Sequence, residues 1–213
     1  PRGSLPLSTA LWRFSRASAF TALGRTGEAK RERARFLVAA KAVPADAVFG
    51  NNKASVLLDI AHKVLDGEIA ARSGRYDEAV SLLREGVELE DSLRYDEPPD
   101  WVQPVRHALG ATLVEAGRFA EAETVYREDL RTYPNNGWSL FGLAQALRKQ
   151  GKNEEAESIR ALFEHEWAEA DISPHASCLC SRRAAQGDAA EARRTSTKDR
   201  ASPATSGSTR NEA

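Results

Sequence analysis

The hydrophobic pattern is clearest between residues 101 and 134, where it predicts two helices. In the first, residues 101–116, the apolar positions follow the 3.6-residue period of an amphipathic helix and are Val102, Val105, Leu109, Leu113 and Val114. Asp100 precedes this helix as a predicted N-cap, and Gly117 ends it because glycine accepts the positive φ of a helix C-terminus. The second helix ends before Pro134, and its apolar side consists of Phe119, Ala122, Val125, Tyr126 and Leu130.

The same pattern then occurs again. Gly117-Arg118-Phe119-Ala120-Glu121-Ala122 recurs as Gly151-Lys152-Asn153-Glu154-Glu155-Ala156, with an offset of 34 residues. The second copy predicts one helix over 137–150 and another from 153 to about 170. A fixed period in this range indicates a stacked array of helix pairs.

These two copies resemble the tetratricopeptide repeat family. The matching residues are the pairs Leu109-Gly110 and Leu143-Ala144, the helix-ending Gly117 and Gly151, the small Ala122 and Ala156, and Tyr126 and Pro134. Two positions depart from the family pattern, because Asp129 stands where a small residue is usual and Arg160 where an aromatic residue is usual. The resemblance implies an all-α fold in which antiparallel helix pairs stack as a short right-handed α-solenoid. The chain is similar to the C-terminal part of a bacterial protein of this family.

Weaker copies of the turn signature precede the strong ones, at Gly24 and at Gly74. We therefore predict four units, at about 8–42, 54–91, 101–134 and 137–170, in one helical domain that covers residues 1–172. The signatures are 50 and 43 residues apart in this part of the chain, which predicts long connectors. From Ser173 to Ala213 large apolar residues nearly vanish, and such a segment is predicted to be a disordered tail.

The connector before Trp101 has an unusual composition, with Tyr95 followed by acidic residues and the pair Pro98-Pro99. It is open to two interpretations. The segment folds into the groove of the array or touches a ligand, or it is a spacer whose Tyr95 and Trp101 cover the seam between the second and third units.

Composition narrows the function classes. The 213 residues carry 30 Lys and Arg against 31 Asp and Glu, a balance that argues against a nucleic-acid-binding chain. No apolar run is long enough to span a membrane, and we expect a cytoplasmic protein without a membrane partner. The first acidic residue is Glu28, so the N-terminal stretch is compatible with an organelle transit peptide, although the signature at Gly24 favours a degenerate first repeat.

Candidate chemistry is sparse. Cys178 and Cys180 are the only cysteines, and with only His175 nearby they do not make the four-ligand set of a zinc site. The sequence contains no phosphate-binding loop, no His-Glu-x-x-His motif and no nucleophile elbow. We therefore predict no catalytic residue, no enzymatic activity, no metal and no cofactor.

A peptide-binding surface is implied by the resemblance, because the first helix of each family unit lines a concave groove. Residues at i, i+4 and i+8 on those helices share a face. The predicted groove residues are Glu68, Arg72, His107, Glu115, Trp138, Phe141, Gln145 and Lys149. Trp138 and Phe141 are open to a second interpretation, as ordinary packing between repeats.

The sequence therefore predicts a non-enzymatic scaffold that binds a peptide or a partner protein in this groove. An alternative hypothesis is a C-terminal regulatory or stabilising part of a larger enzyme, since the chain begins at Pro1 and has no Met. Self-association through the terminal helix near Trp167 is a further possibility, because a last repeat without a capping helix leaves apolar surface exposed.

Overall fold

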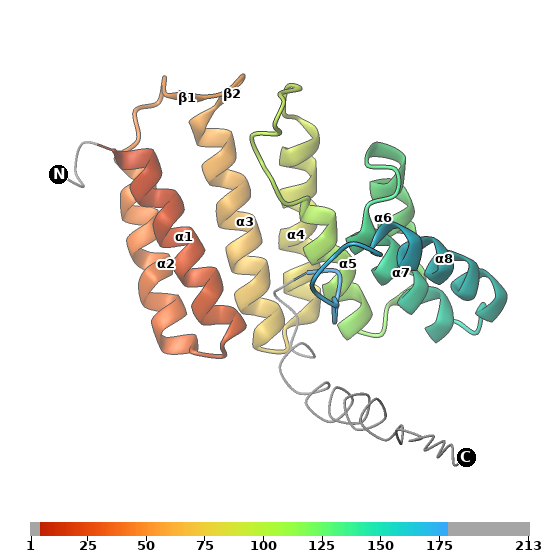
Figure 1. Ribbon diagram of the computed structural model, residues 1–213. Coiled ribbons are helices and arrows are strands. Elements are labelled where there is room, and N and C mark those ends of the chain that lie inside the picture. Colours follow the sequence, from red (N-terminus) through yellow and green to blue (C-terminus); the bar gives the residue numbers. More distant parts are fainter. Residues whose placement is uncertain (1–4, 179–213) are drawn as a thin grey trace, which may run out of the picture.

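The computed structural model describes residues 5–178, and residues 1–4 and 179–213 lie outside this description. Within it the fold is all-α, an α-solenoid of four antiparallel helix pairs joined by short turns or longer connectors (Figure 1). The helices are α1 Pro6–Ala22, α2 Thr26–Lys41, α3 Ala54–Arg72, α4 Tyr76–Asp91, α5 Val105–Glu115, α6 Phe119–Thr132, α7 Gly137–Lys149 and α8 Asn153–Glu166. The fold class predicted from the sequence is confirmed.

The repeated turn signature has a common backbone structure. Gly24, Gly74, Gly117 and Gly151 all have φ between 73° and 78°, a left-handed conformation that glycine adopts without steric cost. The next residue donates its N–H back to the carbonyl five positions earlier, as in Arg118 to Leu113 at 2.9 Å. This is the Schellman motif, which satisfies carbonyls at the end of the first helix. The signature therefore encodes the tight turn within each pair.

The last residue of the signature lets the two helices of a pair approach closely. Ala29, Ala79, Ala122 and Ala156 are all almost fully buried. The basic residue after the glycine also pairs with the glutamate three positions later in the first three units, for example Arg118 with Glu121 at 2.7 Å. In the fourth unit Lys152 binds Glu123 of α6 instead, at 2.7 Å.

The helices form two layers. The first helices contact one another in the order α1, α3, α5, α7, and each second helix contacts the first helix of the following pair. We call the surface of α1, α3, α5 and α7 that points away from the second helices the inner face. One apolar cluster runs from α3 to α8, and a second joins α1, α2 and α3 around Phe36, so neighbouring pairs supply each other's core.

The two long connectors bind each other. Between α2 and α3 the chain forms a two-residue antiparallel hairpin, β1 Val48–Phe49 and β2 Asn52–Lys53, turned at Gly50. The Asn52 side chain accepts from the N–H of Arg94 at 2.8 Å and donates to the carboxylate of Asp100 at 2.7 Å. We call these bonds between residues 51–52 and 94–100 the connector contact.

Helix α5 begins later than the sequence predicted, and Asp100 is not its N-cap. Pro104 has an extended backbone, with ψ of 129°, so helical geometry starts only at Val105. The N–H of Val105 is bound by the carboxylate of Glu90, at 2.9 Å. Asp100 is instead used by the connector contact.

The two aromatic residues of this connector differ in burial. Trp101 is half-buried and packs against Phe14 of α1, with ring centroids 5.7 Å apart. Tyr95 is 79% exposed. Trp101 therefore has the packing role of the spacer interpretation, although it reaches the first unit, and Tyr95 does not cover a seam.

Candidate functional site

The predicted groove residues of α3 lie beside the first helix pair. Glu68 is half-buried, and burial raises its pKa to about 7, although the nearby Ser18 hydroxyl acts in the opposite direction. Arg72 is also half-buried, and its guanidinium lies so close to Gly24 that a Cβ there would stand 2.9 Å from Nη2. This part of the surface carries charges of both signs.

The predicted groove residue His107 does not face outward. It is 1% exposed, and its Nε2 lies 3.1 Å from a carboxylate oxygen of Asp129, which is fully buried. Ser139 donates to the same oxygen at 2.6 Å. The side chain of His107 therefore points between α5 and α6, and this predicted contact is wrong for the side chain.

The cluster of His107, Asp129 and Ser139 contains the residue types of a hydrolase triad in a different arrangement. In a triad the serine hydroxyl binds the histidine and the aspartate binds the other side of the ring. Here serine and histidine both bind the aspartate, and the exposed fractions are 1% or less. The arrangement ties α5, α6 and α7 together, and it explains why Asp129 departs from the small residue usual at this position.

Trp138 and Phe141 belong to an aromatic cluster at the end of the array. Trp138 packs edge-on against Trp167 with centroids 5.4 Å apart, and Phe141 packs against Phe163 at 5.5 Å. Phe163 stacks on Trp167, whose indole N–H donates to the carbonyl of Ile172 at 2.7 Å. Both residues are half-buried, which fits the packing interpretation.

The remaining predicted residues are more open. Glu115 at the end of α5 and Gln145 on α7 are half-buried, and Lys149 in the last turn of α7 is exposed.

Residues after α8 return across the array toward α5 (Figure 1). Residues 168–173 are exposed, whereas Ala176, Ser177 and Cys178 are at most 8% exposed. Ser177 donates to the carbonyl of His107 at 3.0 Å and lies 2.6 Å from the hydroxyl of Tyr126. Residues 176–178, which the sequence assigned to the tail, are therefore packed on the helices. The rest of the predicted tail lies outside the described residues.

Tyr126 reaches this segment through a gap between α5 and α7. A Cβ at Gly110 would stand 2.4 Å from its ring and one at Gly142 only 2.2 Å. The two glycines thus let the ring pass from α6 to the inner face, and burial raises the pKa of its hydroxyl above the ordinary value. The sequence marked Tyr126 only as a packing residue and gave no signal for Ser177.

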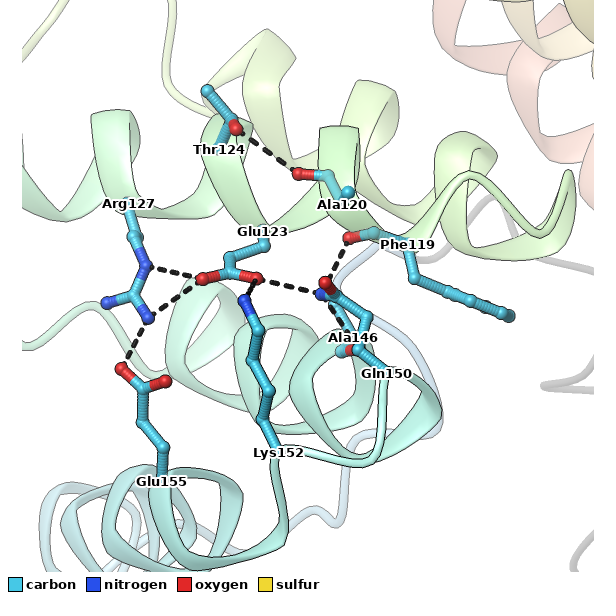
Figure 2. Close-up of polar contacts among 9 residues, drawn as sticks. All are labelled: Phe119, Ala120, Glu123, Thr124, Arg127, Ala146, Gln150, Lys152 and Glu155. Atoms are coloured by element: carbon cyan, nitrogen blue, oxygen red, sulfur yellow. Dashed lines mark hydrogen bonds and ion pairs between the residues drawn. The ribbon is translucent and has the colours of Figure 1, made fainter.

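The outer side of the third and fourth units is held by a polar network around Glu123 (Figure 2). Its carboxylate accepts from Lys152 at 2.7 Å, Gln150 at 2.8 Å and Arg127 at 3.0 Å. Burial alone would raise the pKa of Glu123, but these donors lower it below its ordinary value. The network joins α6 to the turn between α7 and α8.

A hollow lies between the second helices α6 and α8, where residues of α7 also line it. It is an open depression of about 450 Å³, and its lining residues are Arg127, Leu130, Arg131, Pro134, Asn135, Leu140, Leu143, Ile159 and Leu162. Arg131 is exposed at its edge and marks the outer side of the array.

Two further sequence predictions concern metals and membranes. Residues 5–178 contain no group of three or more His, Cys, Asp or Glu side chains that could hold a metal ion. Cys178 is disulfide-bonded, and Cys180 lies outside the described residues. None of the helices in the same range combines the length and apolar character needed to cross a bilayer.

Comparison with known proteins bears on the repeats. The tetratricopeptide repeat family matches residues 113–160 and, in a second match, residues 64–85. No curated protein matches the chain. Among solved structures the chain is similar to MamA AMB-1, with 19% sequence identity, a TM-score of 0.44, and coverage of 76% of this chain and 94% of that chain.

Proposed function

Because the chain is a tetratricopeptide repeat protein, we propose that it is a non-enzymatic scaffold that holds a peptide or partner protein against its inner face. Helices α3, α5 and α7 lie in succession on that face. Stacked repeats of this kind form extended surfaces that contact partners along several units. Protein–protein interaction is the general role that this architecture supports.

One observation carries the choice of the inner face. The seam between α5 and α7 already accommodates a non-helical stretch of polypeptide, the chain's own residues 176–178, with Ser177 1% exposed. A surface that buries one such stretch has the shape and the hydrogen-bonding groups to receive a peptide.

Charged residues along the inner face would set the choice of partner. Glu68, Arg72, Glu115 and Lys149 carry both signs and are not fully buried. Complementary charges at the edge of an interface govern specificity and association rate more than affinity. A partner with alternating charges fits this surface better than one with a single sign.

Site-specific photo-crosslinking tests the proposal. A photoreactive amino acid is placed in the full chain at Gln145 or Lys149, predicted inner positions, and separately at Arg131, the matched outer position. We expect one protein partner to crosslink from the inner positions and not from Arg131. A partner that crosslinks equally from Arg131, or only from there, would exclude the inner face as the binding surface.

A further inference from the structure

The segment Ala176-Ser177-Cys178 packs on the repeats with small, buried side chains. Its three side chains are small, with Cys178 disulfide-bonded, and the residues are 8%, 1% and 3% exposed. The six residues before Pro174, from 168 to 173, are exposed. The segment is thus attached to the helices at one buried point, and an exposed linker separates that point from Trp167.

We propose that the seam between α5 and α7 is a binding site for a peptide with a hydroxyl residue between two small residues, and that Ala176-Ser177-Cys178 occupies it as an internal ligand. This inference rests on the proposed function and names the class of peptide that the inner face selects. A partner peptide gains the site by displacing the chain's own segment.

The hydroxyl requirement follows from the two hydrogen bonds of Ser177. The carbonyl of His107 can only accept, so the single hydroxyl proton of Ser177 is donated to it, over 3.0 Å. The Tyr126 hydroxyl, 2.6 Å away, must then donate to Ser177 Oγ. A side chain without a hydroxyl loses both bonds and leaves a buried tyrosine hydroxyl unsatisfied, which is costly.

The site is built into the array rather than made by the segment. Tyr126 is fully buried and is held in the gap between Gly110 and Gly142. The carbonyl of His107 belongs to the first turn of α5, and the His107 side chain is fixed by Asp129. The donor and the acceptor are therefore pre-positioned, which lowers the free-energy cost of binding.

The test uses the full chain and a fluorescein-labelled peptide with the sequence of residues 172–178 carrying Cys178→Ser. Ser177→Asp places a carboxylate against the carbonyl of His107 and should expel the internal segment. Ser173→Asp adds the same charge at an exposed position and is the matched control. Circular dichroism checks that each variant keeps its helices.

We expect the Ser177→Asp protein to bind the labelled peptide about tenfold more tightly than the wild-type and Ser173→Asp proteins, because the internal competitor is removed. A peptide with valine in place of its central serine should bind about tenfold more weakly. Tyr126→Phe, added to Ser177→Asp, should reduce this preference for serine while keeping the ring in place.

Three results would overturn the inference: no gain for Ser177→Asp, an equal gain for Ser173→Asp, or equal binding of the serine and valine peptides. The scaffold function is scored separately by crosslinking from Gln145. A Ser177→Asp protein that crosslinks its partner there but binds no peptide refutes the internal ligand alone. If the wild-type chain forms no crosslinks to a partner from the inner positions, the scaffold proposal itself is refuted.

Discussion

Glu68→Gln should stabilise the protein at alkaline pH. Glu68 is half-buried in α3, and burial raises its pKa from 4.5 to about 7. Between these two values the unfolded chain has lost the proton while the folded protein keeps it, so stability falls as the pH rises. Each pKa unit corresponds to about 1.4 kcal/mol, and with a discount for partial exposure the full cost above pH 7 is about 1–3 kcal/mol.

Urea unfolding followed by circular dichroism at pH 5 and pH 8 measures this effect. The glutamine keeps the shape of the side chain and removes the charge, so the variant should gain about 1–3 kcal/mol over wild type at pH 8 and much less at pH 5. Burial also raises the pKa of Glu90 to about 7, so Glu68→Gln should retain part of the slope and Glu68→Gln/Glu90→Gln should lose most of it.

Equal effects of Glu68→Gln at the two pH values would refute this reasoning. Carboxylates whose pKa is lowered do not interfere with this measurement, because their contribution to stability changes in a lower pH range. Burial would raise the pKa of Glu32, but hydrogen bonds from Arg13 and Arg35 lower it, so its stabilising effect is lost only as the pH falls below about 4.5.

Three other substitutions test the packing. Gly142→Ala places a Cβ 2.2 Å from the buried tyrosine of α6 and should cost about 1–3 kcal/mol in urea unfolding, whereas Gly27→Ala, at an exposed position in α2, should be neutral or slightly stabilising. Glu123→Ala removes the acceptor of three donors. It should lower the free energy of unfolding by about 1 kcal/mol and so lower the thermal midpoint, and Lys152→Ala should cause a smaller loss. Equal losses for the two variants would contradict the central position of the carboxylate. Trp101→Ala opens the core against α1 and should cost about 3 kcal/mol; a cost below about 1 kcal/mol would show that this contact is dispensable.

The helix pairs were predictable because their signals are local. Each Gly-Arg or Gly-Lys turn fixes a backbone conformation within six residues, and the buried alanine five positions after the glycine follows directly. The start of α5 was not predictable in the same way, because Asp100 is a suitable cap in sequence but is engaged by Asn52 of a distant connector. Competition for one side chain between local and long-range partners is invisible to a pattern of apolar positions.

For the candidate site, the sequence predicted which face of the helices is used but not which side chains reach it. The helical period placed His107 toward the groove, but the carboxylate of Asp129 turns its ring inward, and the sequence contains no measure of that attraction. The aromatic partners Phe163 and Trp167 come from α8 and the turn after it. Ser177 lies in a polar segment that cannot build a core of its own, and it is buried only because the glycines of α5 and α7 let Tyr126 reach it.

The connector contact has a consequence for the order of folding. Its bonds join residues 42 and 48 positions apart, from Asn52 to Arg94 and to Asp100, whereas each helix pair closes over a short turn. Contacts between distant residues require closure of a longer loop and tend to form after local ones. The hairpin should therefore bind the second connector only once α3 and α4 have paired. Substitutions at Asn52 should then accelerate unfolding and leave the folding rate nearly unchanged, as expected of a contact made after the rate-limiting step.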